Sequence, residues 1–440
     1  MTPSPARILI RGGRLLDPSQ GMDEITDLLI EEGKVARIGK NLKPEAAQTL
    51  DAKGKVVVPG FIDLHVHLRT PGQEHKETVL TGSRAAVRGG FTTICTMANT
   101  DPVVDSANVI EFLKSEGAKA GLANLLPYAA VTKGLKGESL TEMGELQQAG
   151  AVGFSDDGMP IASAGMMRKA LEYSRATGLP VIDHCEEKSL SGHGVMHEGL
   201  TAARLGLAGI PAEAETVMVA RDILLAGAVD GRLHVAHLST AQGVELIRAA
   251  KKRGLRVTAE VTPHHLVLSE EALSTYDSRF KMNPPLRTQK DVEALREGLK
   301  DGTIDAVATD HAPHSAAEKE VGLAQAPFGV VGLETAFAVL LTELVHRGAL
   351  SLNALVEALT RRPAKVLGID RGTLVVGSAA DVAVLDTEAE WAVEAAAFAS
   401  KGINTPFLGW RLKGKITDVL VGGRPVYRGG QFTNGGSHHG

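Results

Sequence analysis

The alternation of short apolar segments with amphipathic segments most strongly limits how this chain can fold. Eight apolar segments lie between residues 57 and 313, and most are followed by a stretch of helical periodicity such as AQGVELIRAAKKRG or TQKDVEALREGLKDG. Strands that alternate with helices form parallel βα units, and eight such units predict a closed (β/α)8 barrel. The eight segments are VVPGFIDLHVH, FTTICTM, ANLLPYAAV, AVGFSD, LPVIDHC, RLHVAHLS, RVTAEVTPH and IDAVATDHAP.

A doubly wound open sheet is the alternative to a barrel. Such a sheet usually carries a glycine-rich phosphate loop after its first strand, and the sequence has none there. The barrel is therefore the favoured fold, and helices from about 331 to 368 would complete its wall.

The two ends of the chain differ from this middle part, because both consist of short Val-rich strands broken by glycines. A chain of 440 residues also exceeds the usual size of a single core. We therefore expect residues 1–57 and 370–440 to pack together as one discontinuous β-sandwich domain. Residues 58–369, between them in the sequence, would form the barrel. The tail NGGSHHG, despite its paired histidines, is predicted to be frayed.

Composition excludes several classes of protein. A formal charge of -5 shows no basic excess for nucleic-acid phosphates, and no run of about 18 apolar residues predicts a membrane span. The N-terminus MTPSPARILIRGG lacks the pattern of a secretory signal, so a cytoplasmic location is expected. Cys95 and Cys185 fall in predicted strands and are interpreted as small buried hydrophobic residues.

Polar side chains occur where the predicted strands end, which in such a barrel is where active sites form. In DLHVHLR, period-two alternation places His65, His67 and Arg69 on one face of an extended segment. A structural strand with two hydrogen-bonded core histidines is the alternative for this segment alone. The later strand ends add Asn99, Asp156, Asp157, His184, His237 and Asp310.

Imidazole and carboxylate groups together favour zinc or related divalent metals, and a second ion would need a bridging carboxylate. Asp157 is preferred over Asp156 for that bridge, although Asp-Asp-Gly could be a simple turn. His264 and His265 follow the seventh strand, either as ligands or as polar neighbours of ligands. His234 is predicted to be structural.

A set of motifs in fixed order resembles the amidohydrolase superfamily and, within it, the class I dihydroorotases. These enzymes interconvert N-carbamoyl-L-aspartate and dihydroorotate in pyrimidine biosynthesis. The resemblance spans nearly the whole chain, including GSAADVAVLD near its end. Across residues 63–337 the motifs are DLHVHLRTPG, TMANT, GFSDDG, DHCE, HVAHLST, EVTPHHL, KMNPPLR, ATDHAPH and APFGVVGLETAF.

The resemblance implies two zinc ions per subunit. One would be held by His65, His67 and Asp310, the other by His184 and His237, with Asp157 and a hydroxide as bridges. Related hydantoinases and allantoinases use a carboxylated lysine as the bridge, whereas Ser-Asp-Asp-Gly at that place contains no lysine. The substrate contacts implied are His67, Arg69, Asn99, Asn283, His314, Phe328 and Gly329.

The implied chemistry assigns Asp310 as the general base and acid and Arg69 as the group that binds the substrate carboxylate. For Arg69 a salt bridge to a neighbouring Asp is the alternative. Ala98 replaces the proline usual before Asn99, which would loosen that loop. Residues 312–330 form a long connection that we expect to act as a lid.

Two other functions remain open from the sequence. One is a hydantoinase or allantoinase, and the other is a non-catalytic scaffold for aspartate carbamoyltransferase. The resemblance also leaves open a homodimer and an association of an active enzyme with that carbamoyltransferase.

Overall fold

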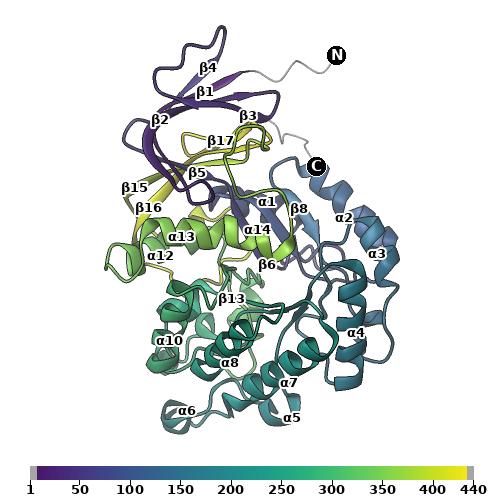
Figure 1. The fold of residues 1–440 in the computed structure, drawn as a ribbon. Helices are drawn as coiled ribbons and strands as arrows, with labels where there is room; N and C mark the ends of the chain where they lie inside the picture. The colour runs from purple at the N-terminus through teal and green to yellow at the C-terminus, as the bar shows by residue number, and fades with distance from the viewer. Residues whose placement is uncertain (1–6, 434–440) are drawn as a thin grey trace.

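The computed structural model describes residues 7–433, and the tail expected to fray lies outside them. Figure 1 shows a helix-rich body below a strand-rich part, and both ends of the described chain lie in the strand-rich part. The body contains the eight apolar segments in parallel arrangement.

The barrel consists of two parallel sheets joined by isolated bridges. One sheet has the order β6-β7-β8 and the other β14-β13-β12-β9. Phe154 bridges Ala129 on one side and Val181 on the other, and Val66 pairs with His311 to close the ring. The predicted (β/α)8 barrel is thus confirmed. Its strands are β6 (Phe61–Val66), β7 (Phe91–Thr96), β8 (Asn124–Pro127), β9 (Val181–Asp183), β12 (Leu233–Val235), β13 (Val257–Val261) and β14 (Ala306–Val307).

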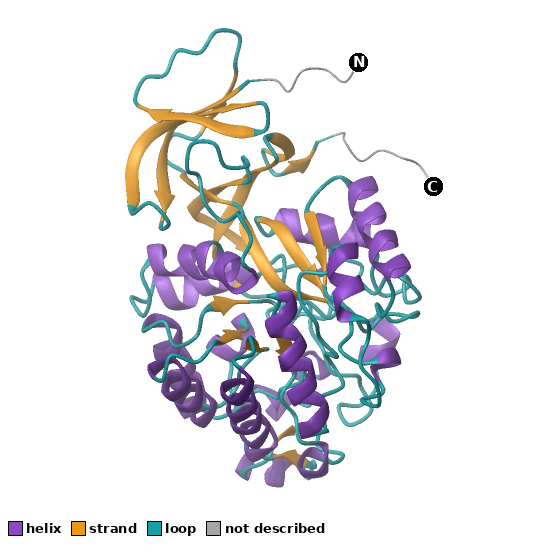
Figure 2. Ribbon diagram, turned by 45° about the vertical axis from the view of Figure 1, so that its right-hand side comes forward, coloured by secondary structure: helices purple, strands orange, loops and turns teal. Residues whose placement is uncertain are grey.

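The predicted helices surround the strands (Figure 2). Several begin at threonine caps: the Thr240 hydroxyl accepts from the Gly243 N–H, and Thr78 and Thr288 form capping boxes. The main helices are α1 (Val79–Arg88), α2 (Ala107–Ala120), α3 (Met143–Ala149), α4 (Ala164–Thr177), α7 (Glu213–Val229), α8 (Ala241–Lys252), α10 (Gln289–Lys300), α12 (Ala336–Leu340), α13 (Leu352–Leu359) and α14 (Arg361–Leu367).

Shorter elements lie mainly in the connections at the mouth of the barrel. They are α5 (Lys188–Ser191), β10 (Met196–His197), α6 (Leu200–Leu205), β11 (Gly209–Ile210), α9 (Pro263–Val267) and α11 (Ala316–Lys319).

One sheet unites the two ends of the chain, as expected of the accessory domain. Its order is β18-β17-β16-β15-β5-β1-β2-β3, with β4 on β1, so β5 joins the N-terminal strands to the C-terminal ones. The domain boundaries themselves stay a prediction. The strands are β1 (Ile8–Asp17), β2 (Met22–Glu31), β3 (Lys34–Gly39), β4 (Gln48–Asp51), β5 (Val56–Pro59), β15 (Val382–Ala392), β16 (Arg411–Val421), β17 (Arg424–Arg428) and β18 (Gln431–Phe432).

Two details of the expected strands were wrong. The first segment, expected as one strand, is divided at Gly60 into β5 and β6, and β6 already ends at Val66. Gly60 lies so close to Thr92 that a Cβ atom would be 2.2 Å from the Thr92 side chain. Alternation along a strand therefore does not extend to Arg69, which has a left-handed φ of 61°. The fourth segment, AVGFSD, forms a single bridging residue, Phe154, instead of a regular strand.

The connection between β15 and β16 reaches the mouth of the barrel. Its Asn404 side chain donates to the Ala312 and Gly329 carbonyls at 3.2 and 3.1 Å, and Ser400 hydrogen-bonds to Glu77. Residues of the C-terminal part thus contact the 312–330 loop directly.

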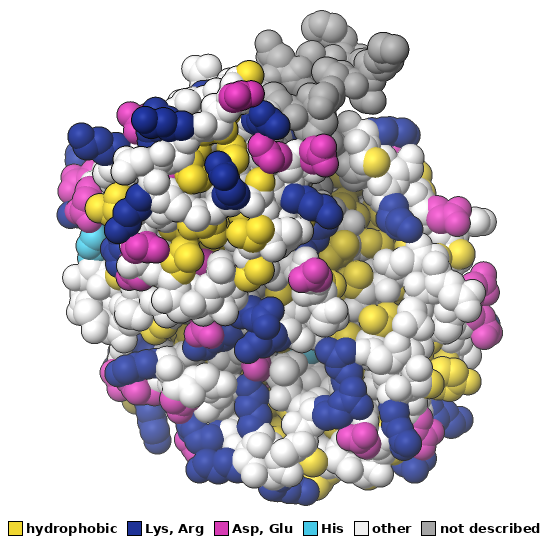
Figure 3. All heavy atoms as spheres, turned by 45° about the horizontal axis from the view of Figure 1, so that its top comes forward, with side chains coloured by type: hydrophobic (Ala, Val, Ile, Leu, Met, Phe, Trp, Pro, Cys, Tyr) yellow, Lys and Arg dark blue, Asp and Glu magenta, His cyan; other side chains and the backbone are white. Residues whose placement is uncertain are grey.

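Basic and acidic side chains are interspersed on the face that Figure 3 turns forward. Among residues 7–433 no helix is long and apolar enough to cross a membrane. Cys95 and Cys185 are buried and unpaired, as expected.

Candidate active site

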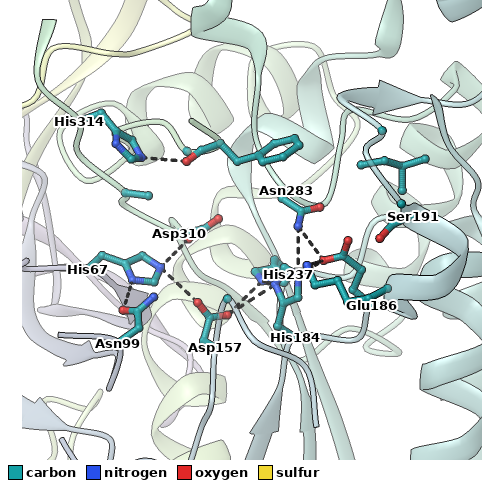
Figure 4. A pocket seen from close by; sticks show the side chains of 18 of the residues that line it. His67, Asn99, Asp157, His184, Glu186, Ser191, His237, Asn283, Asp310 and His314 are labelled. Atoms are coloured by element: carbon teal, nitrogen blue, oxygen red, sulfur yellow. Dashed lines mark hydrogen bonds and ion pairs between the residues drawn. The ribbon is translucent and has the colours of Figure 1, made fainter. Parts of the chain in front are cut away.

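Asp157 lies among four imidazoles that the barrel brings together from different strand ends. Its Oδ1 is 3.4 Å from His65 Nε2, 3.5 Å from His237 Nε2 and 3.7 Å from His184 Nδ1. Its Oδ2 is 3.4 Å from His67 Nε2. Figure 4 shows three of these rings around the carboxylate. The sequence placed all five residues at the ends of barrel strands, and the structure brings them together.

Asp310 supplies a second carboxylate on the side of His65 and His67. Its Oδ1 is 3.2 Å from His67 Nε2 and 3.5 Å from His65 Nε2. Burial alone would raise the pKa of Asp310, but the two imidazoles hold it below its ordinary value. The carboxylate therefore stays ionised in this setting.

The cluster fits divalent metal ions on its own geometry. The ligand atoms of His65, His67 and Asp310 lie within 4.8 Å of one another, as do those of His65, Asp157 and His237. His65 Nε2 and Asp157 Oδ1 are buried, and neither has a hydrogen-bond partner in the described part of the chain. Because such orphaned atoms are costly, a cation that both could bind would satisfy them. Imidazole and carboxylate donors suit zinc and its close relatives.

The rings of the cluster are oriented by polar groups behind them. His65 Nδ1 donates to Glu260 Oε1 at 2.9 Å, and the other oxygen of Glu260 lies 3.1 Å from His234 Nε2. His67 Nδ1 donates to Asn99 Oδ1 at 2.9 Å. Such contacts fix the tautomer of a ligating histidine. Glu260 was not among the residues predicted from the sequence, although a charged residue within the apolar strand VTAEV is a usable signal.

The structure separates the role of Asp156 from that of Asp157 and shows where His264 and His265 lie. Asp156 Oδ1 accepts from the backbone N–H groups of Val131 and Thr132 at 2.7 and 3.0 Å, so it braces the loop while Asp157 faces the rings. His265 is hydrogen-bonded to Thr262 and to the Pro284 carbonyl. Neither His264 nor His265 belongs to a described metal-capable group.

A cavity of about 310 Å³ opens above the cluster. Except for the deeply buried His65, it is lined by every metal ligand and substrate contact expected from the sequence. The lining residues expected are His67, Arg69, Asn99, Asp157, His184, His237, Asn283, Asp310, His314, Phe328 and Gly329.

Three of these residues have a left-handed backbone although none is glycine: Arg69 has φ 61°, His237 φ 30° and Asp310 φ 48°. Such conformations are unfavourable and are typically held by the surrounding fold at functional sites. Alternation along a strand could not predict them, because each lies just beyond its strand. They aim the three side chains into the cavity.

The 312–330 loop forms one wall of the cavity. His314 Nε2 donates to the Phe328 carbonyl at 2.8 Å, and Lys319 Nζ donates to the Pro327 and Gly329 carbonyls at 2.9 and 3.0 Å. Burial and the nearby Arg69 guanidinium lower the pKa of His314 to about 3, so the ring is neutral at pH 7. Opening of this loop as a lid stays a prediction.

Two further parts of the cavity wall are the loop at Ala98 and the segment that follows β9. The Ala98 carbonyl accepts from the Thr100 and Val104 N–H groups, and these bonds brace the loop that presents Asn99. Whether Ala98 loosens that loop stays a prediction. Glu186, Lys188 and Ser191 also contribute polar groups to the cavity wall, and none of them was predicted as a site residue from the sequence.

The sequence of this chain is similar to those of known proteins over nearly its whole length. A family model described as "Dihydro-orotase-like" matches residues 54–243. The chain is 56% identical to the dihydroorotase of Anaeromyxobacter dehalogenans (strain 2CP-C) over 427 residues, covering 96% of this chain and 98% of that protein. The chain belongs to the dihydroorotase family. A family member from Pelotomaculum thermopropionicum is 55% identical, with coverage of 96% and 98%.

Solved structures of other cyclic amidohydrolases share the fold. L-hydantoinase (dihydropyrimidinase) from Arthrobacter aurescens superposes with a TM-score of 0.87 at 30% identity over 97% of both chains. Dihydropyrimidinase from Brevibacillus agri NCHU1002 gives 0.83 at 27% identity, covering 97% and 96%. The chain is therefore more similar in sequence to the dihydroorotases than to the hydantoinases. It is a cyclic amide hydrolase, and its site can hold metal ions.

Proposed function

We propose that this enzyme catalyses the reversible cyclisation of N-carbamoyl-L-aspartate to dihydroorotate and water in pyrimidine biosynthesis. Arg69 carries this proposal. Its guanidinium lines the cavity beside the metal-capable cluster, and its Nε donates to the Pro313 carbonyl at 3.2 Å. Among residues 7–433 it forms no ion pair within 4.0 Å. A cation in that position is suited to an anionic substrate.

Dihydroorotate carries a ring carboxylate that a plain hydantoin lacks, and a guanidinium can bind both oxygens of such a group. Asn99 also lines the cavity; its Oδ1 accepts from His67, and its Nδ2 has no hydrogen-bond partner among residues 7–433 and can donate to a ligand. Asn283, His314, Phe328 and Gly329 line the remainder. We assign these residues, with His67, to substrate binding.

Two zinc ions per subunit are the proposed cofactors. His65, His67 and Asp310 would hold one and His184 and His237 the other, with Asp157 shared between them, as the distances from Asp157 to the four rings support. When bound, the ions supply a nucleophile derived from water at neutral pH and polarise the scissile carbonyl.

Asp310 is the proposed proton carrier. In ring opening it accepts a proton from the attacking water and returns it to the ring nitrogen as the C–N bond breaks. In cyclisation it takes the proton from the carbamoyl nitrogen and delivers it to the departing oxygen. Arg69 meanwhile holds the substrate carboxylate, so the reacting carbonyl stays beside Asp310.

A hydantoinase or allantoinase is the second candidate, since solved hydantoinases share the fold. Against it, an aspartate, Asp157, occupies the place between the histidines where those enzymes would carry a carboxylated lysine. The ligand set and the open cavity also favour an enzyme over a scaffold for aspartate carbamoyltransferase. A cytoplasmic location, a homodimer and an association with that carbamoyltransferase stay predictions.

One experiment separates the three functions: zinc per chain is measured together with turnover of dihydroorotate, hydantoin and allantoin. We expect two zinc ions and turnover of dihydroorotate alone. Turnover of hydantoin or allantoin without dihydroorotate would reject the proposal, and a zinc-free, inert chain would favour the scaffold.

A further inference from the structure

Glu186 joins a metal-facing histidine to a residue of the substrate cavity. It is buried, with 7% of its surface exposed. Its Oε2 lies 3.0 Å from His184 Nε2 and accepts from Asn283 Nδ2 at 2.9 Å. Figure 4 shows these contacts converging on one carboxylate, away from Asp157. His184 and Asn283 are 99 positions apart in sequence, yet Asn283 Nδ2 also lies 3.2 Å from His184 Nε2, so the three side chains form one cluster.

The contact with His184 determines which ring nitrogen faces the cluster. A carboxylate only accepts hydrogen bonds, so His184 Nε2 must carry the proton and Nδ1 keeps its lone pair. That Nδ1 faces the cluster: it lies 2.9 Å from His237 Nε2 and 3.7 Å from the Asp157 carboxylate. His65, His67 and His237 instead face Asp157 through Nε2. His184 is therefore the one ring of the four that needs a partner on Nε2.

The contact with Asn283 fixes the orientation of a neutral side chain. Because Nδ2 donates to Glu186, the amide cannot flip without losing that bond. Its Oδ1 forms no hydrogen bond within residues 7–433 and remains available at the cavity as an acceptor for a substrate N–H.

Lys188 forms an ion pair with the Glu186 carboxylate. Its Nζ lies 2.5 Å from Glu186 Oε2 and its side chain is 49% exposed, so the ion pair extends from the buried carboxylate to solvent. A buried charge without such a partner would be costly. The pairing lets an ionised carboxylate serve both His184 and Asn283.

We propose that Glu186 is a positioning residue that sets the His184 tautomer and the Asn283 amide together. Retention of the metal held by His184 and binding of the substrate by Asn283 thereby both depend on the Glu186 carboxylate. This inference rests on the proposed function, because it assigns His184 to a metal ion and Asn283 to the substrate.

Glu186→Gln is the main test. Glu187→Gln is the matched control, because Glu187 is the next residue, is only partly buried, and its carboxylate accepts from the Ser189 N–H instead of lining the cavity. Both proteins are loaded with zinc, and the rate of zinc release to a colorimetric chelator is measured beside KM and kcat for dihydroorotate. In Glu186→Gln we expect zinc to be released about 10–100-fold faster, in line with the loss of metal affinity that follows removal of such a supporting contact. KM should rise as well, and Glu187→Gln should match the unaltered enzyme in both.

Zinc release and KM equal to those of Glu187→Gln would overturn the inference. A higher KM with unchanged zinc release would also overturn it, because the two effects would then be separable. Zinc release needs no turnover, so it tests the inference even if dihydroorotate proves not to be the substrate. If Glu186→Gln does not fold, Glu186→Asp keeps the charge at a shorter reach and must show the same paired changes, smaller in size.

Discussion

The Asn404 side chain donates to the Gly329 carbonyl at 3.1 Å and so connects the segment before β16 to the wall of the substrate cavity. A second bond to the Ala312 carbonyl and one accepted from the His314 N–H make Asn404 a bracket for the start and end of the 312–330 loop. Part of the cavity wall is therefore held by the C-terminal region.

Asn404→Ala should raise KM for dihydroorotate several-fold while zinc content stays unchanged. The variant loses three hydrogen bonds to the loop, each worth about 1 kcal/mol, and the cavity wall becomes less ordered. Steady-state kinetics and limited proteolysis of the loop would measure this. Ile403→Ala is the control, since Ile403 is the exposed neighbour. Equal KM values in both variants would argue against the bracket.

Asp310→Asn should preserve the fold and much of the zinc yet lower kcat by about 10²–10⁴-fold, because an amide cannot carry the proton. Circular dichroism, zinc analysis and turnover in both directions would measure this. Asp370→Asn, at an exposed aspartate outside the cavity, is the control. Near-normal turnover of Asp310→Asn would contradict the assigned role.

Arg69→Ala should weaken dihydroorotate binding by about 1.5–3 kcal/mol, the value of a hydrogen bond to a charged group, with little change in zinc content. Arg69→Lys keeps the charge without the planar fork and should give an intermediate loss. Binding can be measured by competition in the kinetic assay. Unchanged affinity in Arg69→Ala would mean that another group holds the carboxylate.

Glu334 should make stability depend on pH. Burial raises its pKa from 4.5 to about 7, although the Ala399 and Ser400 N–H groups favour the ionised form. Between these values the folded chain keeps a proton that the unfolded chain has released, so stability falls as pH rises through this window.

Glu334→Gln removes this titration while retaining an acceptor for both N–H groups. Relative to the variant, the unaltered protein should lose up to about 3 kcal/mol of unfolding free energy from pH 4.5 to 7. Denaturant unfolding of both proteins at several pH values would measure the difference in their unfolding free energies. Titrating groups that both proteins share contribute equally and cancel in this difference. Parallel pH curves would contradict the prediction.

The barrel and the metal-capable cluster were predictable because they depend on local pattern. Apolar segments mark strands, and residues at strand ends must meet at one rim. The contact of Glu186 with Asn283 and those of Asn404 with the 312–330 loop were not predictable in this way, since they join residues far apart in sequence and depend on how loops pack. Arg69 reached the cavity as expected but through a left-handed turn, which alternation cannot reveal.

The position of β5 has a consequence for synthesis of the chain. β5 pairs with β15 and continues through Gly60 into β6, the strand that precedes His67. When residue 370 leaves the ribosome, every proposed metal ligand and β1, one neighbour of β5, have been made, but its other neighbour β15 and the Asn404 bracket have not. We therefore expect the substrate cavity to become fully ordered only after residues 382–421 have been made.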